Sequence, residues 1–151
     1  MSNGTTVKKR NGRGTEPLDL EKIHRMVEEA TKGLAGVSAS QVEIQSGIQF
    51  YDGITTEEIQ EILIKSASDL IDLDHPNYQF VAARLLLFAL RKSLYGKMRE
   101  LPHLEEHIYT CVNKEVYDAG LYDKYSKEEI DKANGYIDHG RDFLFTYAGL
   151  R

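Results

Sequence analysis

Near its N-terminus the chain reads VKKRNGRGTEPLDLEK, from Val7 to Lys22. Asn11-Gly12 is a favoured two-residue turn between two extended flanks, so this stretch predicts a β-hairpin. Pro17 cannot donate a ladder hydrogen bond and keeps the second strand short. Asp19 is a good N-cap, and apolar residues recur behind it at helical spacing. The stretch therefore predicts a hairpin that leads directly into a helix.

The rest of the chain shows helical patterns. Capping boxes, which place a Gln or Glu three residues after a Ser or Thr, begin at Ser38, Thr55 and Ser126. We expect helices over residues 20–34, 56–71, 76–95, 104–112 and 127–137, and a shorter one between Ser38 and Tyr51. The helix over 76–95 is apolar in nearly every direction, which predicts that it forms the buried centre.

The composition is that of an ordinary soluble globular protein, with 151 residues, 41% hydrophobic and 28% charged. This length predicts one domain, or one and a fraction. A formal net charge of -5 argues against a surface that is basic overall and binds nucleic acid. The single cysteine, Cys111, excludes a disulfide framework, a four-cysteine zinc site and a redox pair within this chain.

No membrane segment is expected from the sequence. The longest uncharged apolar run, Leu85 to Leu90, is far shorter than the roughly 18 residues that suggest a spanning helix. The polar and basic stretch Met1 to Arg13 lacks the apolar core of a secretory signal. We therefore expect a cytoplasmic protein.

Cations gather at the tip of the predicted hairpin and at the start of the first helix. Lys9, Arg10 and Lys22, together with backbone N–H groups, have the chemistry that a triphosphate needs. Glu16 and Asp19 can accept hydrogen bonds from ribose hydroxyls or from an adenine amino group. A basic hairpin tip is also a common solvated edge that prevents aggregation, so this alternative stays open. The sequence contains no P-loop spacing.

Two further segments show weaker phosphate signals. Phe88 and Lys92 are four residues apart and share a helix face, and Thr56 and Ile59 open another helix. The alternative for Lys92 is a basic residue that complements the helix dipole. The five histidines show no metal-binding spacing, and Cys111 falls on an apolar stripe typical of a structural cysteine. We expect neither catalytic nor metal-binding residues.

The last residues read FLFTYAGLR, from Phe143 to Arg151, and form an apolar stretch without a helix stop signal. Two interpretations are open. The segment folds back on its own helical bundle, or it belongs to a surface that a second polypeptide completes.

Several motifs together resemble the ATP-cone of the large (alpha) subunit of class I, aerobic ribonucleotide reductase, in its bacterial and T-even-phage type. They are VKKRNG at 7–12, LEKIHR at 20–25, IQFYDGITT at 48–56 and YQFVAAR at 78–84, with YSKEE at 125–129 and FTY at 145–147. The resemblance implies a mainly α fold, with a helical bundle capped by a short β-hairpin or three-stranded mixed sheet and followed by additional helices. It implies a cone over residues 1–97 and, over residues 98–151, helices that lead toward a catalytic barrel.

The resemblance also implies an allosteric activity site for ATP or dATP, with Mg²⁺ accompanying the triphosphate. The implied phosphate contacts are Lys9, Arg10, Lys22 and Lys92, with Thr56 at a helix N-terminus. The implied base and ribose contacts are Glu16 and Asp19, and the implied apolar walls are Val7, Leu18, Ile23, Ile59 and Phe88. Gln60 and Ala89 stand where dATP-inhibited relatives carry histidines near the triphosphate. We therefore expect weak or absent dATP inhibition.

In function, the resemblance implies a regulatory part of the enzyme that reduces ribonucleoside diphosphates to deoxyribonucleotides, inactive alone because the catalytic cysteines lie elsewhere. The implied partners are the remaining large-subunit polypeptide with the catalytic barrel and the radical-generating small subunit, without nucleic acid or membrane. A split gene and a shortened chain are both open explanations of the length.

Two other functions are compatible with a helical domain of this kind. One is a helical module that completes a split catalytic subunit without binding a nucleotide. The other is a transcriptional repressor that carries a cone behind a zinc ribbon. Such a ribbon needs four metal ligands, and residues 1–6 contain no cysteine that could be one of them.

Overall fold

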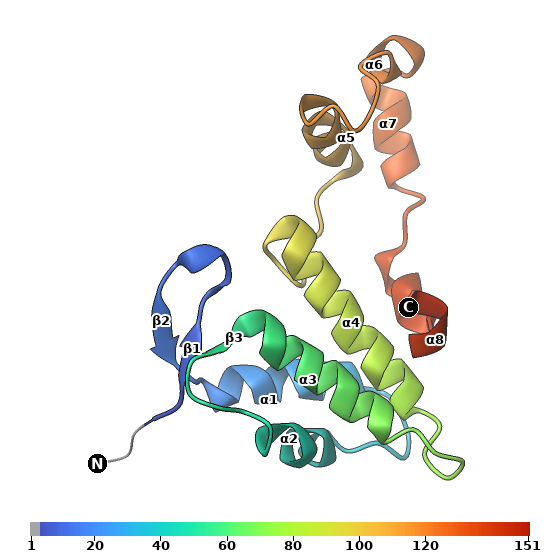
Figure 1. The fold of residues 1–151 in the computed structure, drawn as a ribbon. Coiled ribbons are helices and arrows are strands. Elements are labelled where there is room, and N and C mark those ends of the chain that lie inside the picture. The colour runs from blue at the N-terminus through green and yellow to red at the C-terminus, as the bar shows by residue number, and fades with distance from the viewer. Residues whose placement is uncertain (1–3) are drawn as a thin grey trace. The chain divides into compact units, whose positions relative to one another are not determined.

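The computed structural model describes residues 4–151. The chain divides into two compact units, one formed by the chain up to Leu90 together with Phe143–Arg151, and the other by Arg91–Asp142. The first unit contains a small sheet with helices around it, and the second is helical (Figure 1). The expected mainly α fold with a short three-stranded mixed sheet is confirmed.

The sheet lies in the first unit and consists of β1 (Thr6–Lys8), β2 (Thr15–Pro17) and β3 (Ile54–Thr55), in the order β2-β1-β3. β1 is antiparallel to β2 and parallel to β3. The Asp52 carboxylate accepts hydrogen bonds from the backbone N–H and the hydroxyl of Thr6, at 2.7 and 2.6 Å. These bonds fasten the turn before β3 to the first strand, which brings residues 54–56 beside the hairpin.

The hairpin loop differs from the predicted two-residue turn. The strand register leaves Lys9–Gly14 as the loop, which contains a 3-10 turn, η1 (Arg10–Gly12). The N–H of Lys9 donates to the carbonyl of Gly14 at 2.9 Å and closes the loop. Gly12 and Gly14 have φ angles of +68° and +97°, which residues with side chains rarely adopt. The turn predicted at Asn11-Gly12 is wrong because the left-handed backbone at both glycines forms a longer loop.

The first two helices are α1 (Leu20–Thr31) and α2 (Ala39–Gly47). Both begin at the predicted caps, because the Asp19 carboxylate accepts from the N–H of Lys22 at 3.1 Å and the Ser38 hydroxyl from that of Gln41 at 3.4 Å. Both also end before their apolar patterns do. The N–H of Leu34 donates to the Thr31 carbonyl, so Leu34 lies in a turn after α1.

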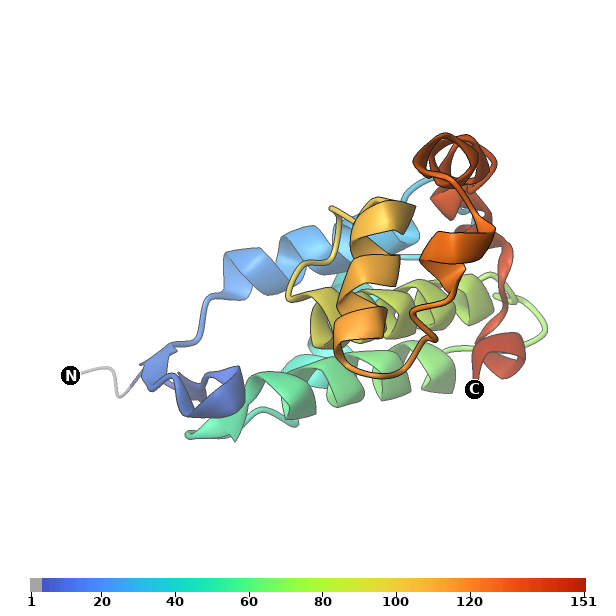
Figure 2. The same ribbon diagram turned by 90° about the horizontal axis from the view of Figure 1, so that it is seen from above.

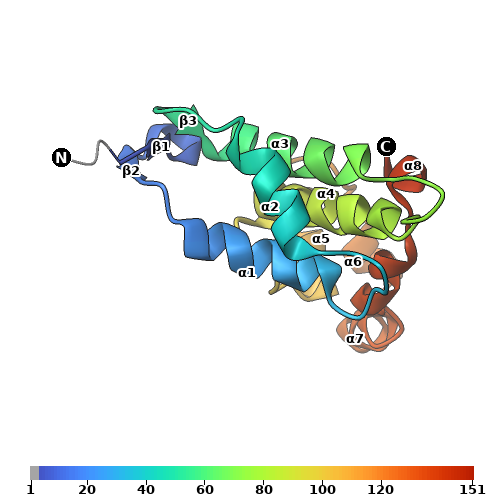
Figure 3. The ribbon, with the colours of Figure 1, turned by 90° about the horizontal axis from the view of Figure 1, so that it is seen from below.

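The core of the first unit lies among α1, α2, α3 (Thr56–Asp69) and the first part of α4 (Tyr78–Tyr95). Figure 3 shows α2 lying between α1 and α3, both of which it contacts. The largest apolar side chains with almost no exposed surface are Val27, Val42, Ile54, Leu63 and Val81. α4 ends at Tyr95 as predicted, but it begins at Tyr78, because Pro76 and Asn77 form a turn before it.

The second unit contains α5 (Leu104–Asn113), α6 (Leu121–Lys124), α7 (Lys127–Asn134) and most of η2 (His139–Leu144), while α8 (Tyr147–Leu150) belongs to the first unit. α5 packs against α7, and Ile108 and Ile130 are the buried apolar residues of this pair. The N–H of Leu104 donates to the side-chain oxygen of Asn134 at 2.9 Å. The predicted helix over 127–137 ends early, at Asn134, where Gly135 forms the C-cap.

Cys111 lies on α5 with partial exposure, and its Sγ is 3.6 Å from Nε2 of His107. The apolar stripe of α5, which predicted a structural cysteine at this position, therefore leaves Cys111 partly exposed to solvent. Throughout residues 4–151, every helix is too short or too polar to cross a membrane.

Candidate functional site

The hairpin loop lies beside the first turn of α3 (Figure 2). β3 pairs in parallel with β1 and leads directly into the helix, so Lys8 lies opposite Thr55. The hydroxyl of Thr56 donates to the carbonyl of Lys8 at 3.2 Å. The structure therefore brings the predicted loop cations and Thr56 together at a helix N-terminus, where backbone N–H groups favour anions.

A complete capping box holds the start of α3. The Thr55 hydroxyl accepts from the N–H of Glu58 at 3.1 Å, and the Glu58 carboxylate accepts from the Thr55 N–H at 2.8 Å. The Tyr51 hydroxyl donates to the same carboxylate at 2.8 Å. The bonds from Thr55 and Tyr51 lower the pKa of Glu58 below its ordinary value. Glu58 is therefore an ionised structural cap of this helix.

Lys9 forms an ion pair with Glu16 across the hairpin, with Nζ and Oε2 2.7 Å apart. The hydrogen bond from Lys9 lowers the pKa of Glu16, and the charge of Lys22 acts in the same direction. Lys22 in turn lies near Asp19, with Nζ 3.6 Å from Oδ2. These four predicted contact residues thus form one connected group of alternating charges at the base and edge of the hairpin.

Arg10 turns away from this group and toward α3. Its Nε lies 2.6 Å from Oε1 of Glu57, and its Nη2 donates to Oε1 of Gln60 at 2.9 Å. The Arg10 side chain is 23% exposed, against 44% for Lys9, so it is the more enclosed of the two loop cations. Gln60 is buried, which leaves its oxygen free of competition from bulk water.

The predicted apolar wall residues belong largely to the core. Val7, Ile23, Ile59 and Phe88 are buried, and Leu18 is half-buried. Phe88 packs against Phe143, in the segment that returns to this unit near the end of the sequence. The role of these residues toward an adenine ring stays a prediction.

Lys92 lies one helical turn after Phe88 on α4 and belongs to the second unit, whereas the hairpin belongs to the first. Its approach to the phosphates therefore also stays a prediction.

Sequence reasoning missed Glu57, which holds Arg10, and Arg84, which fastens α1 to α4. Arg84 donates from Nη1 to the carbonyl oxygens of Ala30 and Lys32, at 3.2 and 2.8 Å. Burial lowers its pKa below the ordinary value of an arginine. A signal was present for Arg84, because an arginine in the middle of an apolar helix needs buried partners. No local pattern identified Glu57.

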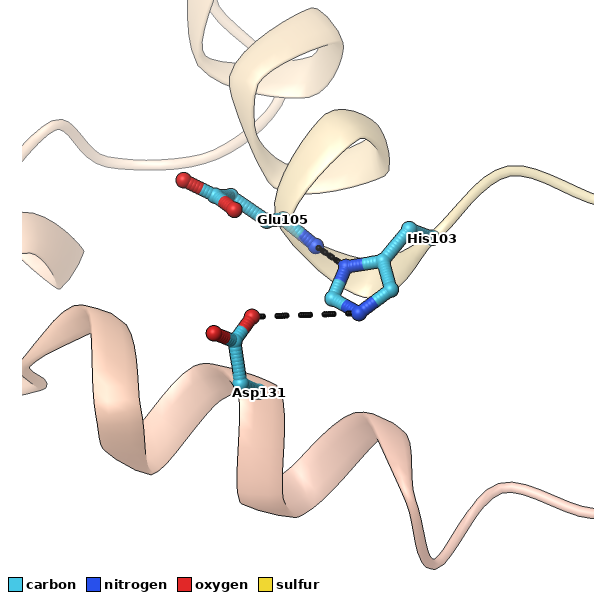
Figure 4. Close-up of side chains that lie close together, drawn as sticks. All are labelled: His103, Glu105 and Asp131. Atoms are coloured by element: carbon cyan, nitrogen blue, oxygen red, sulfur yellow. Dashed lines mark hydrogen bonds and ion pairs between the residues drawn. The ribbon is translucent and has the colours of Figure 1, made fainter.

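A possible metal-binding group is formed in the second unit by His103, Glu105 and Asp131, which offer ligand atoms within 4.8 Å of one another (Figure 4). However, Nδ1 of His103 accepts a hydrogen bond from the N–H of Glu105 at 3.2 Å. A neutral ring then carries its proton on Nε2, the atom that faces Asp131 at 3.8 Å. Neither ring nitrogen offers a free lone pair, so the arrangement suits a helix cap better than a metal.

The model of a known family, the ATP cone domain, matches residues 5–93. This match covers more than half of the chain and includes the hairpin, α1, α2, α3 and most of α4. The chain therefore belongs to the ATP-cone family, as the motifs predicted.

Relatives extend the similarity over the whole chain. Across all 151 residues the chain is 48% identical to the ribonucleoside-diphosphate reductase subunit alpha of Haemophilus influenzae, and 47% identical to the ribonucleoside-diphosphate reductase 1 subunit alpha of Escherichia coli. It is 44% identical over 146 residues to the subunit alpha of Helicobacter pylori. The chain spans about one fifth of the length of these relatives, since it covers 20% of the first two and 18% of the third.

Proposed function

We propose that this chain is the N-terminal regulatory part of a class I ribonucleotide reductase large subunit and that it binds ATP or dATP. The observation that carries the proposal is the meeting of the Lys9–Gly14 loop with the N-terminus of α3, inside the segment matched by the ATP-cone family. Cationic side chains and helix N–H groups together suit a triphosphate, and Mg²⁺ would accompany it.

In this proposal the cationic residues bind the phosphates, and the carboxylates bind the ribose or the base. Lys9, Arg10 and Lys22 bind phosphates, with Thr56 at the start of α3 and Lys92 reaching the same ligand from α4. Glu16 and Asp19 contact ribose or base, and the buried apolar group around Ile59 lines the adenine. The nucleotide-binding part ends near residue 97, and residues 98–151 lead toward the catalytic barrel.

Regulation requires partners. The catalytic barrel, on a continuous or a separate polypeptide, and the radical-generating small subunit complete the enzyme, which works in the cytoplasm. Because Gln60 and Ala89 stand where dATP-inhibited relatives carry histidines, dATP inhibits this enzyme weakly or not at all.

The activity of the assembled reductase tests the regulatory role. ATP should stimulate reduction of a ribonucleoside diphosphate, and Lys9→Ala should shift this stimulation to higher ATP concentration. Stimulation that is unchanged in Lys9→Ala would count against the site. A moderate dose of dATP that stops the enzyme would refute the expected weak inhibition.

A second candidate function is a helical module that completes the large subunit without binding nucleotide. The internal ion pairs favour it, because Lys9, Arg10 and Lys22 each already face a carboxylate. Direct measurement of nucleotide binding separates the two functions.

A further inference from the structure

The guanidinium group of Arg10 lies against α3, and its two contacts there differ in kind. Nε lies 2.6 Å from the carboxylate oxygen Oε1 of Glu57, and Nη2 donates to Oε1 of Gln60 at 2.9 Å. Nε and Nη2 form the forked edge that an arginine uses to bind two oxygens of a carboxylate or a phosphate at once. In this structure Nη2 is hydrogen bonded to Gln60, whereas the buried Nε is ion-paired with Glu57 but makes no hydrogen bond.

We propose that Glu57 is an internal competitor of the triphosphate for Arg10 and so sets the affinity of the activity site. This inference rests on the proposed function. The Glu57 carboxylate holds Arg10 while the site is empty, and a phosphate can use the forked edge only after displacing it. Glu57 also brings a negative charge next to the position of the phosphates, which opposes their approach.

The other carboxylates near the loop have different roles. Glu58 is committed to the cap of α3, where it accepts from Thr55 and Tyr51. Glu16 pairs with Lys9 and is itself a proposed ribose or base contact. For Glu57, the contact that the structure provides is the one with Arg10, and its side chain is 42% exposed. It can therefore swing into solvent when a stronger anion takes its place.

The main alternative to this inference is that Glu57 strengthens nucleotide binding. Glu57 would then preorganise Arg10 so that a phosphate binds the Nη1 end, and its loss would weaken nucleotide binding. The two accounts predict changes of opposite sign, so a single substitution separates them.

The test is a calorimetric titration of the full chain and its variants with ATP. Glu57→Gln keeps the size of the side chain and removes its charge. Glu61→Gln is the matched control, since it removes the same charge one turn further along α3, and Glu61 forms no ion pair among residues 4–151. Glu57→Asp restores the charge and should bring affinity back toward that of the parent chain.

We expect Glu57→Gln to bind ATP roughly three- to fivefold more tightly, the size expected of a partly exposed ion pair, and Glu61→Gln to change little. The gain should shrink as salt rises, which a purely structural effect would not do. Equal or weaker binding by Glu57→Gln, with the parent chain binding ATP, overturns the inference alone. If neither the parent chain nor Glu57→Gln binds ATP, the proposed function fails and the inference fails with it.

Discussion

The ring of Phe143 packs edge-on against the ring of Phe88, with centroids 6.1 Å apart and planes at 73°. The guanidinium of Arg84 lies over the same Phe143 ring, 5.4 Å from its centroid. At Phe143 the apolar segment therefore packs on its own bundle, as the first of the two interpretations predicted, while Leu144 and Phe145 are 73% and 49% exposed. Arg84 in turn donates to the carbonyls of Ala30, in the last turn of α1, and of Lys32, its C-cap residue.

Replacing Phe143 by Ala should lower the free energy of unfolding by about 1 to 3 kcal/mol, because an aromatic pair and a cation–π contact are lost with its packing. Urea unfolding followed by circular dichroism measures this change. Phe145→Ala is the control, since Phe145 is 49% exposed and should cost much less. Equal losses in both variants would contradict the anchoring role of Phe143.

The start of α3 should depend on its capping box. Thr55→Ala removes the hydroxyl that accepts from the Glu58 N–H, and should cost about 0.5 to 2 kcal/mol of stability. Thr55→Ser keeps the hydroxyl and should retain most of the stability. If the serine variant unfolds as readily as the alanine variant, the methyl group rather than the cap stabilises this position.

Local signals were enough to predict much of this fold. The caps at Asp19, Ser38, Thr55 and Ser126 each accept the predicted backbone hydrogen bond, because a cap depends on residues only three positions apart. The prediction of a two-residue turn at Asn11-Gly12 was wrong, because it considered only these two residues. Gly14, two positions further on, also adopts a positive φ and lengthens the loop.

The site could be predicted only in part. The meeting of the hairpin with α3 came from the resemblance, and the sequence contained the cations that meet there. The partners of Arg10 depend on tertiary structure, because Glu57 and Gln60 lie on α3, far from Arg10 in the sequence. Likewise, nothing near Phe143 in the sequence indicates that Arg84 is its neighbour.

The pairing of His24 should make the contact between α1 and α2 depend on pH. Nδ1 of His24 lies 2.8 Å from the carboxylate of Glu43 on α2, and Nε2 lies 3.3 Å from that of Glu28. The hydrogen bond with Glu43, followed by its charge, raises the pKa of His24 above its ordinary value of 6.5. The folded chain therefore favours the protonated ring.

Because the pKa is raised in the folded state, the stabilisation is fully present below about pH 6.5 and is lost as the pH rises through the folded value. His24→Gln should therefore lower the melting temperature more at pH 6 than at pH 8.5. An NMR titration of the His24 ring measures the cause directly. A ring that titrates at or below its ordinary pKa would rule out this coupling.

The loop cations should matter for ATP binding. Lys9→Ala should weaken binding roughly five- to tenfold, because a charge-assisted contact with phosphate is lost while Glu16 is left without its partner. Lys65→Ala is the control, since Lys65 is on α3 but pairs with Asp69 near the other end of that helix. Similar affinities in both variants would mean that the phosphates lie elsewhere.

A calorimetric titration of the purified chain with ATP, and separately with dATP, tests the central claim most directly. We predict saturable binding of ATP in the micromolar range, as expected for several cationic contacts offset by desolvation and ordering. The absence of binding heat and of any thermal shift with either nucleotide would contradict the claim and leave the helical module without a nucleotide site as the function of this chain.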